Sequence, residues 1–561
     1  MTGRVAALLP RAEDYRGLRR SWPRDLAAGV TVAVVALPLA LGFAVATGVG
    51  AQVGLVTAVV AGAGAALLGG SRVQVSGPTG AMTVVLVPLV AAHGPDVVYP
   101  VAVLAGVLVV LAALLRLGRL LAYVPWPLVE GFTLGIAVVI AAQQVPSALG
   151  VDRPEVENAA GAAVVAAGRF LRDPDWAVLG LLALAVAATA LLPRLHRAVP
   201  AALIAVTVVT VVAELTGAGV AVIGALPDGL PAPALPDLGD LPALLGPAAA
   251  VAFLAALESL LSARVADGMT DGPRHDADRE LFGQGVANVA SGLFGGMPAT
   301  GAIARTAVNV RAGASTRVAA LAHALVLAAV VLVAAPLVER IPLVALAGVL
   351  LVTAYRMVER HTVRAVLRST RGDAVVFTLT AGATIALDLI AAVALGLVVA
   401  AVWALVQVAG TARAVPEPVG ADGVDDDEER ALLARSVLVY RLDGPVFFAA
   451  AAHFLAALTA SPGVAVVVLR LSGVDHLDAT GARTLGEVVA ELEERGVTVL
   501  VKGASAEHAR LLTAVGALAA VAARGHVFAD LPAALAHARE HVGQSGRGCA
   551  QAAPVSPAVP R

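Results

Sequence analysis

Apolar stretches long enough to cross the ~30 Å hydrocarbon core of a bilayer recur along this chain from Leu26 to Gln407. Of its 561 residues, 59% are hydrophobic and only 14% are charged, whereas a soluble protein carries roughly a quarter charged residues. Inside a bilayer every backbone polar group must be bonded within the protein, so such stretches form helices. The sequence therefore predicts an α-helical polytopic membrane protein, and we expect no enzymatic activity.

The apolar pattern predicts fourteen spans, grouped as seven plus seven. They lie at residues 26–46, 52–69, 79–92, 97–115, 126–145, 176–192 and 198–214, and at 247–266, 280–296, 302–311, 316–335, 341–355, 374–387 and 389–409. Arginines gather in the N-terminal tail and after even-numbered spans, whereas the loop 215–246 has no Lys or Arg. Because positive charge favours the cytoplasmic side, both termini are expected in the cytoplasm. The Arg-rich, Lys-poor composition is typical of GC-rich bacterial genomes, so we expect a bacterial plasma membrane.

The third and tenth spans are short and begin with similar sequences, "SGPTGAMTVV" (76–85) and "MPATGAIART" (297–306). Paired Gly/Pro-interrupted spans in equivalent positions of two halves indicate the central site of a transporter. A helix that begins inside the membrane leaves N–H groups unpaired and carries positive partial charge at its start. Arg305, one turn into the second short span, can add a full positive charge. We predict an anion site here; helix packing by Gly and Pro, and a structural role for Arg305, are the alternatives.

Glu258 stands deep in the eighth span, and Ser262 lies one turn further on the same face. A carboxylate in the membrane is costly unless it is paired, lines a wet cavity or takes up a proton. Two interpretations stay open: a site that couples a proton or ion to the substrate, and a permanent salt bridge with Arg305. The acidic residues that follow are expected in a solvated cytoplasmic loop without a role: Asp267, Asp271, Asp276, Asp278 and Glu280.

After Gln407 the composition changes, and short apolar strands alternate with amphipathic helices. The expected divisions are a cytoplasmic tail (1–25), a transmembrane transport domain (26–410), an acidic linker (411–431), a small cytoplasmic α/β domain (432–542) and a disordered tail (543–561). The single cysteine, Cys549, argues against disulfides and a Cys-based metal site, and no metal site is predicted.

Several motifs resemble the sulfate permease (SulP) family of anion transporters. They are "ALPLALGFAVATGVGAQVGL" (36–55), "GPTGAMT" (77–83), "ESLLSARVADGMT" (258–270) and "GQGVANVASGLFGGMPATGAIART" (283–306), together with a carboxy-terminal STAS domain. The resemblance implies a seven-plus-seven inverted repeat with core and gate subdomains, usually a homodimer, that works by an elevator-like movement.

The resemblance also implies roles for individual residues. It places substrate against Phe43, Thr79, Gly80, Ala81, Gly301, Ala302, Ile303, Ala304 and Arg305. Pro38 is followed by Leu39, where the family often has Gln, which weakens any claim of hydrogen bonding from that wall. Glu258 resembles the proton-coupled branch, whereas a bicarbonate-transporting branch holds sodium with Asp and Thr at the positions of Glu258 and Ser262.

In the STAS domain, "LDATG" (477–481) resembles the anti-sigma-factor antagonist signature. Thr480, beside Asp478, is then either a phosphoacceptor or a helix cap.

The expected function is secondary active transport of small anions, sulfate first and then bicarbonate or a C4-dicarboxylate, by proton symport. Sodium coupling stays open, and no other cofactor is expected. The competing classes are a nucleobase carrier, against which Arg305 argues, an anion channel, and a membrane-anchored signalling protein whose STAS domain binds a cytoplasmic partner. No nucleic-acid partner is expected.

Overall fold

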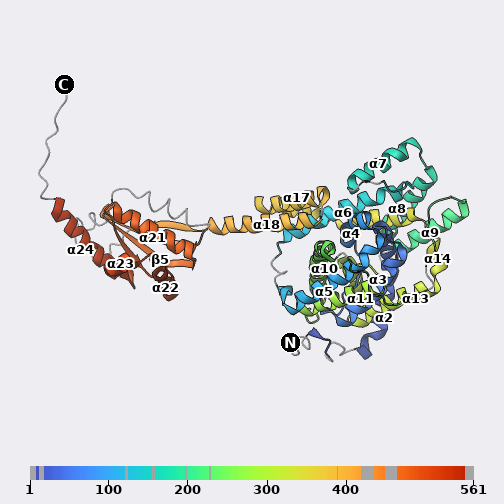
Figure 1. Cartoon of the computed structure of the whole chain (residues 1–561), viewed down its shortest axis with the longest axis horizontal. Coiled ribbons are helices and arrows are strands. Elements are labelled where there is room, and N and C mark those ends of the chain that lie inside the picture. The colour runs from blue at the N-terminus through green and yellow to red at the C-terminus, as the bar shows by residue number, and fades with distance from the viewer. Residues whose placement is uncertain are drawn as a thin grey trace, which may run out of the picture. The chain divides into compact units, whose positions relative to one another are not determined.

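The chain folds into two compact units, Met1–Ala400 and Ala401–Arg561 (Figure 1). The computed structural model describes residues 8–11, 18–119, 124–154, 156, 158–195, 199–226, 229–239, 241–387, 389–417, 435–448 and 464–549. The first unit is built of helices and one short two-stranded ladder, and the second has a five-stranded sheet with helices. The predicted fold class, a helical membrane protein with a small α/β domain, is confirmed.

A helix lies at each of the fourteen predicted spans. In chain order the helices are α2 (Leu18–Thr47), α3 (Ala51–Leu68), α4 (Gly80–His93), α5 (Val98–Leu114), α6 (Trp126–Ala148), α7 (Ala159–Arg172), α8 (Trp176–Leu195), α9 (Ala201–Thr216), α10 (Leu241–Met269), α11 (Ala277–Leu293), α12 (Ile303–Arg311), α13 (Arg317–Val333), α14 (Ala335–Glu339), α15 (Leu343–Met357), α16 (Arg360–Arg368), α17 (Arg371–Ala386) and α18 (Leu389–Ala409). Seven described helices are individually long and apolar enough to cross a membrane. Fourteen crossings therefore stay a prediction.

The helices form two groups that each pack mainly within themselves. One group contains α2, α3, α4, α5, α10, α11, α12 and α13, and the other contains α6, α8, α9, α15 and α17. Glycines allow close approach in the first group: a Cβ at Gly54 would lie 2.1 Å from the Ala40 carbonyl oxygen, and one at Gly106 would lie 2.6 Å from that of Gly285. The two groups meet where α2 contacts α9 and α15, and where α4 contacts α6.

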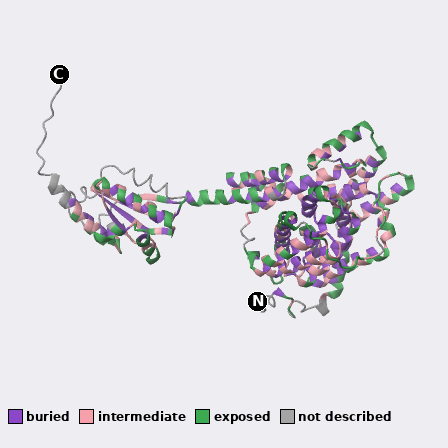
Figure 2. Ribbon diagram, in the orientation of Figure 1, coloured by how far each residue is buried: buried purple, intermediate pink, exposed green. Residues whose placement is uncertain are grey.

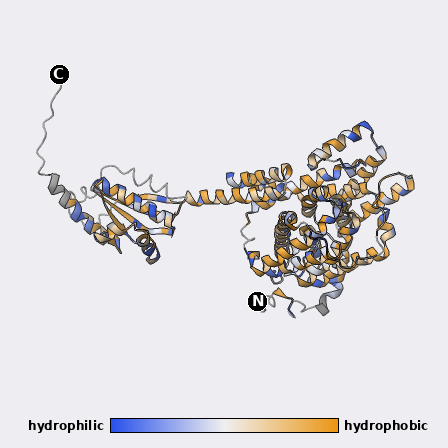
Figure 3. Ribbon diagram, in the orientation of Figure 1, coloured by the Kyte–Doolittle hydropathy of each residue, from blue (hydrophilic) through white to orange (hydrophobic). Residues whose placement is uncertain are grey.

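Hydrophobic residues predominate along the helices of the helical unit (Figure 3). Leu111, Val211, Leu325, Leu332 and Val398 are all exposed, although each is large and hydrophobic. Buried residues gather along the inner helices (Figure 2), and they include polar side chains. An apolar outer surface around an interior that holds polar side chains is the arrangement that a bilayer requires of a membrane protein.

Some boundaries of the helical unit differ from those predicted. Helix α2 begins at Leu18, so residues 18–25 belong to a helix and not to a tail. Among the described helices, three were not predicted: α7, α14 and α16. Their segments are too short or too polar for the length and hydropathy that identify a span; α16, for example, carries Arg360, Arg364 and Arg368.

The second unit contains one sheet with strand order β3-β4-β5-β6-β7. The strands are β3 (Arg413–Glu417), β4 (Val437–Val446), β5 (Val466–Leu477), β6 (Thr498–Lys502) and β7 (Val527–Phe528), and the helices are α21 (Ala479–Glu494), α22 (Ala506–Ala514), α23 (Ala519–Ala523) and α24 (Leu531–Cys549). Only β3 is antiparallel to its neighbour. The central strands are buried on both faces, with α21 in one core and α24 in the other.

Two predicted boundaries of this unit are wrong. Residues 413–417, assigned to the linker, form β3 and pair with β4, because edge pairing does not require an apolar sequence. Helix α24 continues to Cys549, although a disordered tail was predicted from Gly543. The rest of both predicted segments, residues 418–431 and 550–561, lies outside the described part of the chain.

Candidate functional site

A two-stranded ladder brings the two similar segments, 76–85 and 297–306, side by side. Strand β1 (Ser76–Gly77) runs antiparallel to β2 (Thr300–Gly301), with Ser76 opposite Gly301 and Gly77 opposite Thr300. Helix α4 begins at Gly80, just after β1, and α12 begins at Ile303, just after β2. The two helices have 14 and 9 residues, so at 1.5 Å per residue neither spans ~30 Å alone. Both therefore begin inside the helical unit, beside one ladder.

Neither helix start is capped by its own N-cap side chain. The N-cap residues are Thr79 and Ala302, and both have extended backbones without a side-chain cap hydrogen bond. The first N–H groups of such helices carry partial positive charge and favour anions. Ile303 is 42% exposed and Ala304 is exposed, whereas Gly80, Ala81 and Gly301 are buried. The start of α12 is therefore not covered by other described residues.

Arg305 links the two helix starts. Its Nη2 donates a hydrogen bond of 2.7 Å to the carbonyl oxygen of Pro78, immediately before the N-cap of α4. The side chain is only 2% exposed, and Nη1 is buried without a hydrogen-bond partner among the described residues. A Cβ at Gly77 would lie 2.6 Å from Nη1, so the glycine makes room for the guanidinium. The unused Nη1 donor can serve an oxyanion.

Phe43 of α2 also lies at the start of α4. A Cβ at Gly80 would lie 3.3 Å from the Phe43 Cε1 atom and 2.2 Å from the Cδ1 atom of Ile140. Phe43 is 6% exposed, and its carbonyl oxygen accepts a hydrogen bond of 3.3 Å from the Thr83 hydroxyl. The absence of a side chain at Gly80 thus lets the Phe43 ring approach the helix start, whereas its contact with substrate stays a prediction.

Glu258 of α10 contacts the start of α4 and not Arg305. The Thr79 hydroxyl donates to Glu258 Oε2 at 3.0 Å. No ion pair within 4.0 Å joins Glu258 to Arg305 in the described structure, so the permanent salt bridge is not observed. Ser262 does not share this contact, since its Oγ lies 3.0 Å from Thr306 Oγ1. Ser259, which was not predicted, accepts a hydrogen bond of 3.0 Å from the Gly301 N–H.

A polar face of α11 holds both strands in place, and the sequence interpretation missed it. Gln284 accepts a hydrogen bond of 2.8 Å from the Ser76 hydroxyl and donates one of 2.9 Å to the Ala299 carbonyl oxygen. Asn288 accepts from the Ala299 N–H at 2.7 Å and donates to its carbonyl oxygen at 2.9 Å. Polar residues four apart in an otherwise apolar span were the signal that could have revealed this face.

The assignment of Glu280 to a solvated loop is wrong. Glu280 lies in α11, is 1% exposed and accepts hydrogen bonds of 2.8 Å from the Ser71 N–H and from Gln74 Nε2. Asp276 caps the same helix by accepting from the N–H groups of Asp278 and Arg279. These carboxylates have structural roles because the loop before β1 folds onto the start of α11.

In the α/β unit, Thr480 does not cap its helix. Asp478 is the N-cap of α21 and accepts a hydrogen bond of 2.7 Å from the Gly481 N–H. Thr480 lies in the first turn and is exposed. The helix-cap alternative for Thr480 is therefore wrong, and its role as a phosphoacceptor stays a prediction.

The helical unit, with two uncapped helix starts beside an arginine and a carboxylate, defines a multi-pass membrane transporter. A family model described as "Sulfate permease family" matches residues 23–380, and one described as "STAS domain" matches residues 431–534. The chain belongs to the sulfate permease family and carries a C-terminal STAS domain.

Individual relatives agree with this assignment. The YvdB protein of Bacillus subtilis, which has a provisional name as a sulfate transporter, is 36% identical over 89% of this chain and 94% of its own. The transmembrane domain of a cyanobacterium bicarbonate transporter, BicA, matches with a TM-score of 0.62 and 33% identity over 67% of this chain and 98% of that one. Murine Slc26a9, an anion transporter solved in the inward-facing state, has a TM-score of 0.82 at 18% identity over 96% of this chain and 95% of that one. The last likeness shows the fold alone.

Proposed function

We propose that the protein is a secondary active transporter that carries sulfate across a bacterial plasma membrane, with both termini in the cytoplasm. The observation that carries the proposal is the β1–β2 ladder, which sets two uncapped helix starts beside Arg305. Sulfate offers four acceptor oxygens and two negative charges. Backbone N–H groups from two helices and the free Arg305 Nη1 donor supply matching donors and positive charge.

The same site supports coupling of transport to a proton. Glu258 lies on α10, and its contact with Thr79 joins it directly to the N-cap of one anion-binding helix. A carboxyl group inside a membrane protein that forms no ion pair among the described residues is suited to carry a proton with the substrate. Loading of the anion and protonation of Glu258 would then be linked through Thr79.

Sodium-coupled uptake of bicarbonate is the second candidate, supported by the likeness to a bicarbonate transporter. A sodium ion held by Glu258 and Ser262 would need oxygens from both side chains to converge. Ser262 Oγ instead lies beside Thr306 Oγ1, so the contacts favour the proton. A C4-dicarboxylate is a further substrate for the same donors.

The movement that we propose is elevator-like, with one helix group sliding against the other. The helices that build the site, α4, α10 and α12, belong to one group, whereas α6, α8, α9, α15 and α17 form the other. A homodimer would anchor the second group. An anion channel, or a signalling protein whose membrane unit transports nothing, does not couple a proton to an anion. Neither class therefore explains why the carboxyl group of Glu258 lies beside the anion site.

The test is uptake by the purified protein in proteoliposomes, with labelled sulfate, bicarbonate and fumarate compared under separately imposed pH and sodium gradients. We expect an inward proton gradient to drive sulfate above equilibrium. Accumulation driven only by sodium would support the second candidate. Flux that never exceeds equilibrium would indicate a channel.

A further inference from the structure

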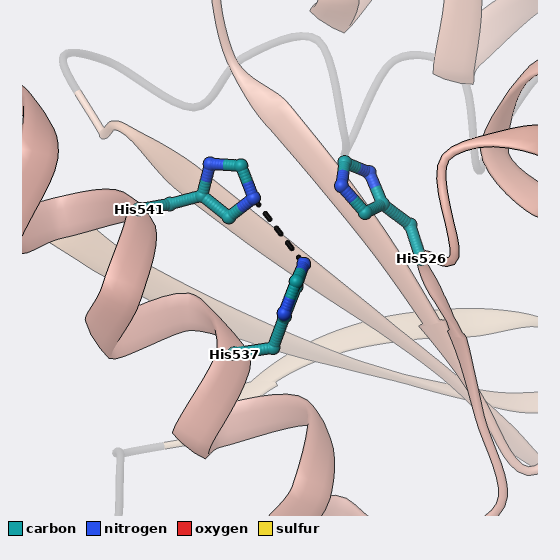
Figure 4. A group of neighbouring side chains, drawn as sticks. All are labelled: His526, His537 and His541. Carbon is teal, nitrogen blue, oxygen red and sulfur yellow. Dashed lines mark hydrogen bonds between the residues drawn. The ribbon is translucent and has the colours of Figure 1, made fainter.

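Three histidines converge at one end of the sheet in the α/β unit. His526 comes immediately before β7, and His537 and His541 lie one turn apart on α24. One ring nitrogen from each lies within 4.8 Å of the others, and Figure 4 shows the three rings facing a common point. Elements that are separate in the fold thus present three imidazoles together.

The separation of two of these nitrogens fits a tetrahedral metal ion. His537 Nε2 and His541 Nε2 are 3.3 Å apart. Two imidazole nitrogens that each lie 2.0–2.1 Å from a tetrahedral zinc ion are separated by about 3.3 Å. Residues four apart on a helix point the same way, so α24 supplies this pair without distortion.

His526 supplies a third ring nitrogen to the cluster. The side chain is 6% exposed, and its Nδ1 has no hydrogen-bond partner among the described residues. A buried ring nitrogen without a partner can serve a metal ion, for which imidazole is the commonest protein ligand.

A carboxylate lies near the second ring nitrogen of His537. Glu540 Oε2 lies 3.6 Å from His537 Nδ1, on the far side of the ring from the Nε2 atom that faces His541. Metal-binding histidines commonly present their second nitrogen to a carboxylate, which orients the ring and raises its basicity. The explanation that needs no metal is a hydrogen bond between His537 and His541, together with edge-to-face packing of the rings at centroid distances of 4.9 to 5.3 Å.

We propose that His526, His537 and His541 form a binding site for a divalent transition-metal cation of the zinc type, with a water molecule as fourth ligand. Imidazole ligands suit zinc and its neighbours and not magnesium or calcium. The ion would tie α24 to the end of the sheet at β7. The sequence interpretation, which looked for cysteine ligands, predicted no metal site.

The test uses the full-length protein in detergent, without a histidine tag and stripped by a chelator, titrated with Zn²⁺ against a chromophoric chelator. We expect one tight equivalent per chain. His537→Ala and His541→Ala should each weaken binding by more than the roughly 10- to 100-fold that loss of an outer-shell partner costs, and Glu540→Gln should weaken it within that range. His476→Ala, at an exposed histidine of the same unit, is the matched control and should bind as wild type.

X-ray absorption of the zinc-loaded protein should show three nitrogen ligands at about 2.0 Å. Thermal unfolding of each variant without metal checks that the fold persists. Absence of a tight equivalent, or tight binding that survives the double substitution His537→Ala and His541→Ala, would overturn the proposal and leave a packed imidazole cluster.

Discussion

Arg305 Nη2 donates a hydrogen bond of 2.7 Å to the carbonyl oxygen of Pro78, so the arginine of the short helix α12 binds the residue that precedes the N-cap of the short helix α4. The contact joins segments more than two hundred residues apart in the chain. It holds the guanidinium in place while Nη1 stays available. The position of Arg305 therefore depends on the neighbouring chain as much as on its own helix.

Gly77→Ala tests this positioning without removing the charge. The added methyl group would lie 2.6 Å from Arg305 Nη1, so the guanidinium must shift. We expect the KM for the transported anion to rise several-fold while the protein still inserts and folds. Gly77 has a φ of +153°, so alanine also strains the backbone there; Gly94→Ala is the matched control, because Gly94 has a φ of +85° and nothing lies within 4 Å of a Cβ there. Equal KM values in both variants would show that Arg305 does not need its present position.

Glu258→Gln separates proton coupling from binding. Glutamine keeps an oxygen that can accept from the Thr79 hydroxyl, but it cannot release a proton. The variant should bind and exchange the anion, yet fail to accumulate it when an inward proton gradient is imposed on proteoliposomes. Glu214→Gln, at an exposed carboxylate 3.8 Å from Arg340, should behave as wild type. Intact proton-driven accumulation in Glu258→Gln would remove the coupling role.

Glu280→Leu should destabilise the helical unit. The substitution leaves the Ser71 N–H and Gln74 Nε2 without their acceptor in a buried place. Each unsatisfied buried donor costs about 1–3 kcal/mol. Thermal unfolding in detergent should shift to lower temperature for Glu280→Leu and less for Glu280→Gln, which keeps one acceptor. Equal stability of Glu280→Leu and wild type would mean that water replaces the carboxylate.

Removal of residues 411–561 should leave anion binding within a few-fold of wild type. Among the described residues, the main core of the helical unit is built only from that unit. Turnover and expression are the properties that we expect to fall. Calorimetry on the truncated protein measures its affinity for the anion. Complete loss of anion binding in a well-folded sample would place part of the site in the STAS domain.

Much of the helical unit was predictable, because span length and hydropathy are local properties. The site was predictable in outline for a different reason. The phrases at 76–85 and 297–306 repeat a Thr-Gly-Ala core, and repetition in equivalent places implies proximity. The ladder that joins Gly77 to Thr300 agrees with that proximity. The individual ligand assignments remain predictions until substrate is bound.

Features that depend on distant partners could not be predicted. Glu280 follows a run of acidic residues, and only its contacts with Ser71 and Gln74, 209 and 206 residues away, make it a buried acceptor. The histidine cluster is similar. His537 and His541 form a local pattern on one helix, but His526 joins them only because α24 packs beside β7.

The most direct test of the anion site is the concentration dependence of labelled sulfate uptake by Arg305→Ala in proteoliposomes. A hydrogen bond from a charged group contributes about 1.5–3 kcal/mol, so the apparent affinity for sulfate should fall roughly 10- to 150-fold. Arg311→Ala, at the exposed far end of α12, should keep the wild-type affinity. A wild-type affinity for sulfate in well-folded Arg305→Ala would contradict an anion site between the two helix starts.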